Sequence, residues 1–250
     1  MNRITRCAGA LALASISLAA LGQEYPNKSI RFVVPFPPGG SGDLVARAIG
    51  TRMTETWNVP VVVDNRAGGG GNIGALFVAR SPADGYTILL GTQSSQIIGP
   101  IMQEPPPFDP VNDFTPLSLA VVIPLILTAH PGVPARNVRE LIALARAKPN
   151  SVNFGSTGVA TSTHLAGELF KRMAKIEIVH VPYKGGGPAT ADLLAGNIQL
   201  LFGSVSTTLP HVKSGKLRAL GVAGSKRSAA APDIPTIGEG LPGYEFLQWL

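Results

Sequence analysis

The sequence predicts an α/β protein, and three observations lead to that prediction. Short apolar runs of strand length alternate with segments whose apolar residues recur at helical spacing. Glycine-rich turns connect run and helix at 39–42, 68–71, 155–158 and 185–187. A hydrophobic content of 45% over 250 residues argues against disorder and suffices for a sizeable core. Strands that alternate with helices form parallel sheets, so we expect helices on the sheet faces.

The first half of the chain predicts the order strand, helix, strand, helix, strand. The strands are expected at 30–36, 59–65 and 86–92, and the helices at 43–57 and, after a glycine turn, within 68–81. The proline-rich stretch 102–114 then predicts a long loop. A parallel sheet with a helix after each of its first two strands is therefore expected.

The second half begins with an apolar stretch, 115–132, that predicts two strands broken at Pro124. A proline between strands suits a crossover from one lobe to another, so we expect crossing strands at 120–124 and 216–222. Asn137 and Glu140 resemble a capping box at a helix start. Further helices are expected at 138–148, 162–174 and 184–196, and further strands at 151–158, 176–183, 198–204 and 216–224. The tail 225–250 is expected to be loop-rich, without a clear final helix.

The N-terminus predicts a secretory signal peptide. Arg3 and Arg6 precede an apolar run, and Ala20-Leu21-Gly22 fits a small-x-small cleavage site after Gly22. A membrane anchor is the alternative, but the run is short for a span. The single cysteine lies inside this segment, so the exported chain is expected to hold no disulfide.

The charge balance favours an anionic small molecule over nucleic acid. The formal charge is +6, from 21 basic and 15 acidic residues. Without Arg3 and Arg6 the balance is 19 against 15, or +4. The basic residues are scattered and form no patch, which argues against nucleic acid, while a mild positive bias suits an anion.

The glycine turn at 38–43 predicts an anion cradle at a helix N-terminus. It lacks the lysine of a Walker A loop, and Val45 stands where a dinucleotide fingerprint needs its third glycine. Asp43 would repel a polyphosphate, so a small carboxylate is the better candidate. The alternative is a purely structural turn that packs helix on strand.

No motif for catalysis or for metal binding is present in the sequence. No G-x-S-x-G elbow occurs, and the four histidines lack metal-ligand spacing, so no metal and no cofactor are expected. His164 is interpreted as a structural residue. The rival hypothesis is a periplasmic hydrolase acting on a carboxylate or ester, with Ser41 or Ser162 beside His164.

Several motifs in order resemble one known family over residues 25–249. They are "FVVPFPPGGSGDLVARAI", "VDNRAGGGGNIGA", "SPADGYTILLGT", "FGSTGVATSTHLAGELF", "VPYKGGGPATADLLAGNI" and "GKLRALGVAGSKR". Together they resemble the Bug-type solute receptors of tripartite tricarboxylate transporters. The resemblance implies a non-enzymatic, monomeric periplasmic receptor that captures a small carboxylate and delivers it to the membrane permease.

The implied fold is that of a type II periplasmic binding protein, with two α/β lobes joined by crossing strands. Carried onto this chain, the first lobe takes 23–121 and 223–250, and the second takes 122–222. Relatives of this family run on beyond Leu250, so the first lobe is expected to be incomplete and the C-terminal part to be missing.

The resemblance also implies the ligand-binding residues. They are Pro38, Gly39, Gly40, Ser41, Gly42, Asp43, Asn65 and Thr92 in the first lobe, and Ser156, Thr157, Gly158, Thr163, His164, Tyr183, Lys184 and Ser204 in the second. Gly42 is expected where the backbone approaches the ligand. One departure is informative: Gly203-Ser204 replaces the family's frequent Asp-Ser, which disfavours an amino-acid ligand and favours a simple di- or aromatic carboxylate.

Overall fold

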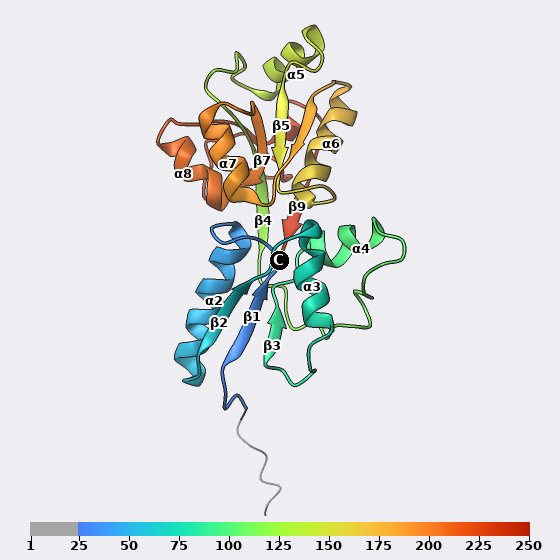
Figure 1. Cartoon of the computed structure of the whole chain (residues 1–250). Coiled ribbons are helices and arrows are strands. Elements are labelled where there is room, and N and C mark those ends of the chain that lie inside the picture. Colours follow the sequence, from blue (N-terminus) through green and yellow to red (C-terminus); the bar gives the residue numbers. More distant parts are fainter. Residues whose placement is uncertain (1–24) are drawn as a thin grey trace, which may run out of the picture.

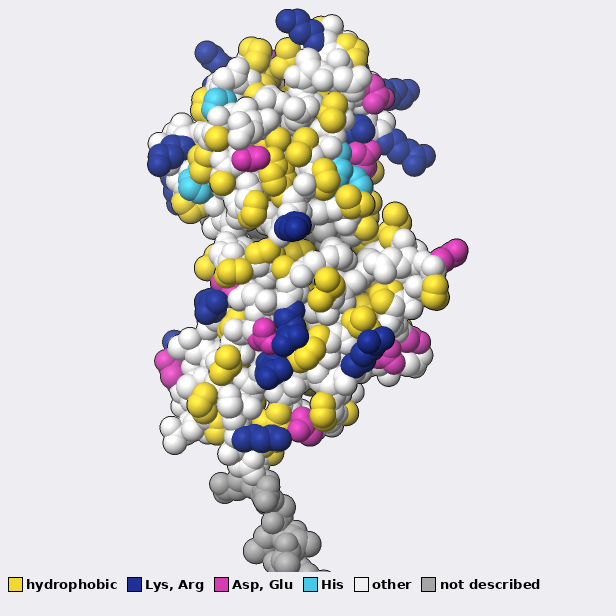
Figure 2. Space-filling model, in the orientation of Figure 1, with side chains coloured by type: hydrophobic (Ala, Val, Ile, Leu, Met, Phe, Trp, Pro, Cys, Tyr) yellow, Lys and Arg dark blue, Asp and Glu magenta, His cyan; other side chains and the backbone are white. Residues whose placement is uncertain are grey.

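The computed structural model describes residues 25–250 as two α/β lobes stacked end to end (Figure 1). The predicted signal peptide, residues 1–22, lies outside the described residues. Among residues 25–250, no helix combines the length and hydropathy that a membrane span requires. On the face drawn in Figure 2, Lys and Arg side chains are dispersed over both lobes and interleaved with acidic ones.

The first lobe is built on a three-stranded parallel sheet in the order β2-β1-β3. Its elements are β1 (Ile30–Val34), α2 (Ser41–Trp57), β2 (Val61–Asn65), the short turn η1 (Gly69–Gly71), α3 (Asn72–Ala79) and β3 (Thr87–Leu89). Alternate residues of β1 face opposite helices: Phe32 and Val34 share a core cluster with Ala46 of α2, whereas Arg31 lies beside Phe77 of α3. The predicted order of strands and helices is confirmed.

The second lobe contains a mixed sheet in the order β6-β5-β7-β4-β8. Its elements are β4 (Val122–Ala129), α5 (Val138–Ala147), β5 (Asn153–Ser156), α6 (Ser162–Ala174), β6 (Val179–Pro182), α7 (Gly186–Ala195), β7 (Leu200–Ser204), α8 (Val205–Lys213) and β8 (Arg218–Val222). Phe154, Phe170 and Phe202 are fully buried at its centre. The predicted cap of α5 is confirmed, because Glu140 N donates to Asn137 Oδ1 at 2.9 Å.

The prediction of two strands broken at Pro124 is wrong, because β4 runs through the proline as one strand. Val122–Pro124 pairs with β9 (Leu247–Trp249), and from Leu125 onward β4 pairs with β7 and then also with β8. Pro124, which has no N–H to donate, therefore lies where the strand changes partners. The return crossing is made by β9, beside β4 in Figure 1, and not by 216–222, because β8 pairs within the second lobe.

Five elements went unpredicted: η2 (Ser94–Ile98), α4 (Gly99–Ile101), helix α8, the short turn η3 (Ile237–Glu239) in the tail, and strand β9. Helix α8 contains Pro210 and several β-branched residues, which weaken a helical pattern. In the tail, Thr236 and Glu239 form a capping box at η3.

The tail also bears on the division into lobes. Ile237 and Tyr244 pack in the same core cluster as Phe154 and Phe170. The predicted boundary at 222 stays a prediction, but this packing favours a second lobe that extends to about residue 246.

Candidate functional site

A cavity of about 460 Å³ lies between the lobes. It opens where β1, β5 and β6 end, the usual place for ligands in open α/β sheets. Its lining residues come from both lobes: Phe36, Gly68, Gly69, Gly70, Gly71, Asn72, Gly99, Met102 and Gln103 from the first, and Thr157, Gly158, Val159, Ala160, Pro182, Tyr183 and Lys184 from the second. Of these described residues, Lys184 alone carries a charge.

In the predicted first-lobe cradle, the polar side chains hold the loop in shape. Asp43 is 4% exposed, and its Oδ2 accepts from Gly39 N at 3.0 Å and from Arg47 Nε at 3.0 Å. Burial raises the pKa of Asp43, but the bonds from Arg47 and Gly39 outweigh it, so the net pKa is lowered and the carboxylate stays charged. Asn65 Nδ2 donates to Phe36 O at 3.0 Å and fixes the same turn.

Gly42 has a structural reason to be glycine. This glycine lies inside α2 and is not among those with a left-handed φ. A Cβ added there would lie 3.3 Å from Leu90 Cδ2 and 3.6 Å from Val34 Cγ1. The missing side chain therefore lets α2 pack closely on the strands, and whether the Gly42 backbone also approaches a ligand stays a prediction. Gly39, with a φ of 81°, is the glycine of this turn that requires left-handed backbone.

The second-lobe loop that precedes α6 is held by hydroxyl groups. Thr163 Oγ1 accepts from Thr157 N at 2.8 Å and lies 2.9 Å from Thr157 Oγ1 and 3.1 Å from Thr161 Oγ1. Ser156 Oγ accepts from Gly158 N at 3.1 Å. Thr157 and Gly158 line the cavity, whereas Ser156 and Thr163 lie behind them, 0% and 2% exposed. These bonds thus fix the loop in shape and hold Thr157 and Gly158 at the cavity wall.

Two stacked histidines support this loop from behind. The ring centroids of His164 and His180 are 4.0 Å apart, and the ring planes meet at 18°. His180 Nε2 lies 2.6 Å from Ser156 Oγ. Burial is the main cause that lowers the pKa of His180 to about 4, and the charge of the neighbouring His164 lowers it further. The His180 imidazole is therefore neutral at pH 7. Ser156 is fully buried and already bonded within the loop, so this pair serves structure and offers no accessible nucleophile.

The serines of the rival hydrolase hypothesis have other partners. Ser162 Oγ donates to Gln248 Oε1 at 3.1 Å, and Ser41 Oγ accepts from Ser204 Oγ at 3.1 Å. His164 Nδ1 accepts from Ala160 N at 3.3 Å, and its Nε2 is 3.9 Å from Glu168. Within the described residues, no hydrogen bond joins His164 to either serine, so this geometry gives no support to nucleophilic catalysis there.

The histidine pair predicts acid sensitivity. Because the folded-state pKa of His180 is below its ordinary value of 6.5, the unfolded chain binds more protons between pH 6.5 and about 4. The free energy of unfolding should therefore fall as the pH is lowered through that window. Denaturant unfolding at several pH values measures this, and His180→Gln should flatten the dependence. An equally steep dependence in the variant would contradict the assignment to His180.

Within residues 25–250, the contacts between the lobes include the following four. Ser162 N donates to Ser94 Oγ at 2.9 Å, and Ser204 Oγ donates to Ser41 Oγ at 3.1 Å. Gly185 lies against Pro37, where an added Cβ would be only 2.8 Å from the proline Cδ. Gly70 lies against the 159–161 loop, where an added Cβ would be 3.3 Å from Val159 O. These contacts describe a closed arrangement of the two lobes.

The predicted site residues thus fall into three groups. Those that line the inter-lobe cavity are Thr157, Gly158, Tyr183 and Lys184, and those that join the lobes are Ser41 and Ser204. The others lie outside the lining: Pro38, Gly39, Gly40, Gly42, Asp43, Asn65, Thr92, Ser156, Thr163 and His164. Whether they contact a ligand stays a prediction. The expected set omitted the 68–72 loop, although its glycine run signalled a turn of the same kind.

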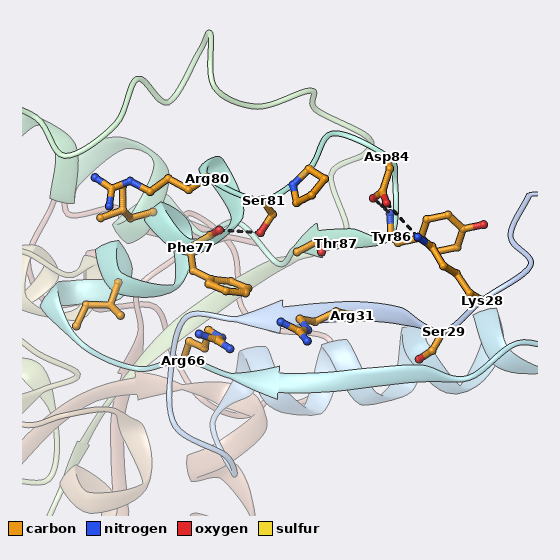
Figure 3. A pocket seen from close by; sticks show the side chains of 13 residues that line it. Lys28, Ser29, Arg31, Arg66, Phe77, Arg80, Ser81, Asp84, Tyr86 and Thr87 are labelled. Carbon is orange, nitrogen blue, oxygen red and sulfur yellow. Dashed lines mark hydrogen bonds and ion pairs between the residues drawn. The ribbon is translucent and has the colours of Figure 1, made fainter.

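A larger cavity of about 800 Å³ lies on the first lobe alone (Figure 3). There the Phe77 ring lies over Arg66, whose guanidinium carbon is 3.6 Å from the ring centroid, and Arg66 also bonds Asp64 at 2.8 Å. Lys28 and Asp84 form an ion pair at 3.2 Å at the other end. Lobe closure cannot enclose a ligand in this groove, so the inter-lobe cavity is the better candidate site.

The chain is similar to several known proteins. Residues 45–250 match the family model described as "Tripartite tricarboxylate transporter family receptor". The chain is 37% identical to protein BugT of Bordetella pertussis, over 96% of this chain and 74% of the relative. It resembles R. palustris Rpa4515 solved with adipate, at 37% identity and TM-score 0.88, and MatC of Rhodopseudomonas palustris with bound malate, at 30% and 0.84. It covers 76% and 77% of those two chains, each over 90% of its own length.

Proposed function

The chain belongs to the tripartite tricarboxylate transporter receptor family, and from that premise we propose that it is a periplasmic solute receptor for a small carboxylate. One observation carries the proposal: a cavity lined from both lobes by glycine-rich loops, with Lys184 as the one charged residue among its described lining. The relatives solved with adipate and malate support a carboxylate ligand. Delivery to the permease subunits of a tripartite transporter is the corresponding role.

The proposed binding mechanism uses helix N-termini. The loop before α6 and the turn before α3 each lead into a helix N-terminus, where the helix dipole favours an anion. The N–H groups of Thr157 and Gly158 already donate to Thr163 Oγ1 and Ser156 Oγ, so a carboxylate beside these residues would be held by the dipole of α6 and would bridge to the 68–72 loop of the other lobe. Binding would thereby stabilise the closed arrangement, which the permease can distinguish from the open one.

Lys184 is expected to contribute less than the loops do. The side chain is exposed, so its attraction for an anion is weakened by solvent and salt. Lys184→Ala should lower carboxylate affinity by about fivefold or less. Calorimetry in low and high salt measures this, and the difference should shrink as salt rises. Complete loss of binding would mean that a side-chain charge, not the loops, holds the anion.

We also propose that the chain reaches the periplasm through cleavage after Gly22 and acts there as a monomer without a cofactor. Mass spectrometry of the exported protein should then give an N-terminus at Gln23, and sedimentation should give the monomer mass. An exported form that retains Met1 would rule out the cleavage.

A binding screen tests the proposed function. Isothermal calorimetry with adipate, malate, succinate, benzoate and glutamate should identify at least one ligand, and NMR should recover it unchanged. The absence of binding throughout a broad carboxylate panel would contradict the receptor proposal. A new product that disappears in His164→Ala would support the hydrolase instead.

A further inference from the structure

Asn72 is a buried side chain whose polar atoms lack partners. It is 5% exposed, and neither Oδ1 nor Nδ2 has a hydrogen-bond partner among the described residues. An unpaired buried amide opposes folding, so nearly all such groups in native proteins are bonded. Asn72 also lines the inter-lobe cavity and opens helix α3. A ligand in the cavity is the natural source of the missing partners.

Gly99 makes room for this amide. A Cβ at Gly99 would overlap Oδ1 of Asn72, although Gly99 has an ordinary helical φ of −60° that alanine adopts freely. Gly99 lines the same cavity. The chain therefore leaves space for the asparagine at a position where its backbone does not need glycine.

The turn before Asn72 leads into the positive end of a helix. Gly68, Gly69, Gly70 and Gly71 all have positive φ, from 57° to 136°, and no side chain caps the start of α3. The N–H groups of Asn72 and Ile73 donate to Gly69 O and Gly68 O of this turn, and the helix dipole favours negative charge beside it. No acidic residue is among the described lining of the cavity. The surroundings of the Asn72 amide thus suit an anionic group.

We propose that Asn72 and the N-terminus of α3 form a subsite for a 2-hydroxycarboxylate end of the ligand. The amide presents one donor and one acceptor, so its complement presents one acceptor and one donor. A carboxylate oxygen accepts from Nδ2 beside the positive end of the α3 dipole, while the adjacent hydroxyl donates to Oδ1. A plain carboxylate supplies no donor and leaves Oδ1 unpaired. This inference rests on the proposed carboxylate-receptor function and names the class of carboxylate.

Matched ligand pairs test the subsite by calorimetry. Malate differs from succinate, and 2-hydroxyadipate from adipate, only by the hydroxyl. The wild type should bind the hydroxy member of at least one pair about tenfold more tightly, the effect of one buried hydrogen bond. Asn72→Leu should abolish that preference, and Gly99→Ala, which displaces the amide, should reduce it. Gln96→Leu is the control, because Gln96 Nε2 is also buried and unpaired but lies outside the cavity lining.

Stability separates this role from a structural one. Asn72→Leu removes two unpaired buried polar atoms, so the ligand-free variant should melt at the same temperature as the wild type or higher. A large fall in its melting temperature, equal affinities within both pairs, or a hydroxyl preference that survives Asn72→Leu would each overturn the subsite. The receptor proposal would still stand if another carboxylate bound. It fails separately if no carboxylate of the panel binds.

Discussion

Replacing Gly185 with alanine is expected to lower carboxylate affinity by roughly ten- to a hundredfold while both lobes remain folded. Gly185 has a φ of 134°, and a Cβ there would lie 2.8 Å from Cδ and 3.0 Å from Cγ of Pro37 in the other lobe. The backbone strain acts in both the open and the closed state, whereas the clash with the rigid proline ring acts only on closure. The substitution therefore penalises the closed, ligand-holding arrangement specifically.

Gly187→Ala is the matched control for this experiment. Gly187 lies two residues further on, at the start of the same helix α7, and an added Cβ there would meet nothing within 4 Å. Calorimetry gives the affinities, and X-ray scattering with and without ligand should show compaction for the control but not for Gly185→Ala. Equal affinities in the two variants would mean that Pro37 and Gly185 do not meet in the bound state.

The fold was predictable where local signals were sufficient. The apolar runs and glycine turns predicted β1, β2, β3 and the helices between them, because these elements are specified by residues adjacent in sequence. Pro124 misled the prediction, since a proline usually ends a strand. Here the strand continues because β4 changes its pairing partner at Pro124, from β9 on one side to β7 and β8 on the other. Helix α8 was missed because packing, and not helix propensity, stabilises it.

The site was predictable only in part, for a related reason. The resemblance to the receptor family implied Thr157, Gly158 and Lys184, which lie in loops at strand ends. The glycine run before Asn72 signalled a similar turn, whereas no sequence motif marked the 99–103 segment as part of the cavity lining. Asp43 lies in a conspicuous motif, and its Oδ2 accepts from Gly39 N of the turn and from Arg47 Nε of α2, so its part in ligand binding stays a prediction. A motif marks a special backbone, and only the fold tells whether a side chain holds that backbone or meets a ligand.

Replacing Thr163 with valine is expected to weaken carboxylate binding by about ten- to a hundredfold. The substitution keeps the shape of the side chain but removes the hydroxyl that accepts from Thr157 N at 2.8 Å and contacts two further threonine hydroxyls. Leaving a buried donor without a partner costs about 1–3 kcal/mol. The loop can recover that bond only by rearranging, and a rearranged loop no longer holds Thr157 and Gly158 in place at the cavity wall.

Thr128→Val distinguishes this local effect from a general loss of stability. Thr128 is 0% exposed in β4 of the same lobe, and its hydroxyl donates to Leu201 O at 3.2 Å, away from the cavity lining. Both variants should lose some free energy of unfolding in denaturant titrations, because each removes a buried hydroxyl. Only Thr163→Val should lose affinity in calorimetry, because only its hydroxyl holds the loop that faces the ligand. If the two variants bind equally well, the loop does not depend on Thr163, and the hydroxyl cluster is a stabilising feature without a part in ligand binding.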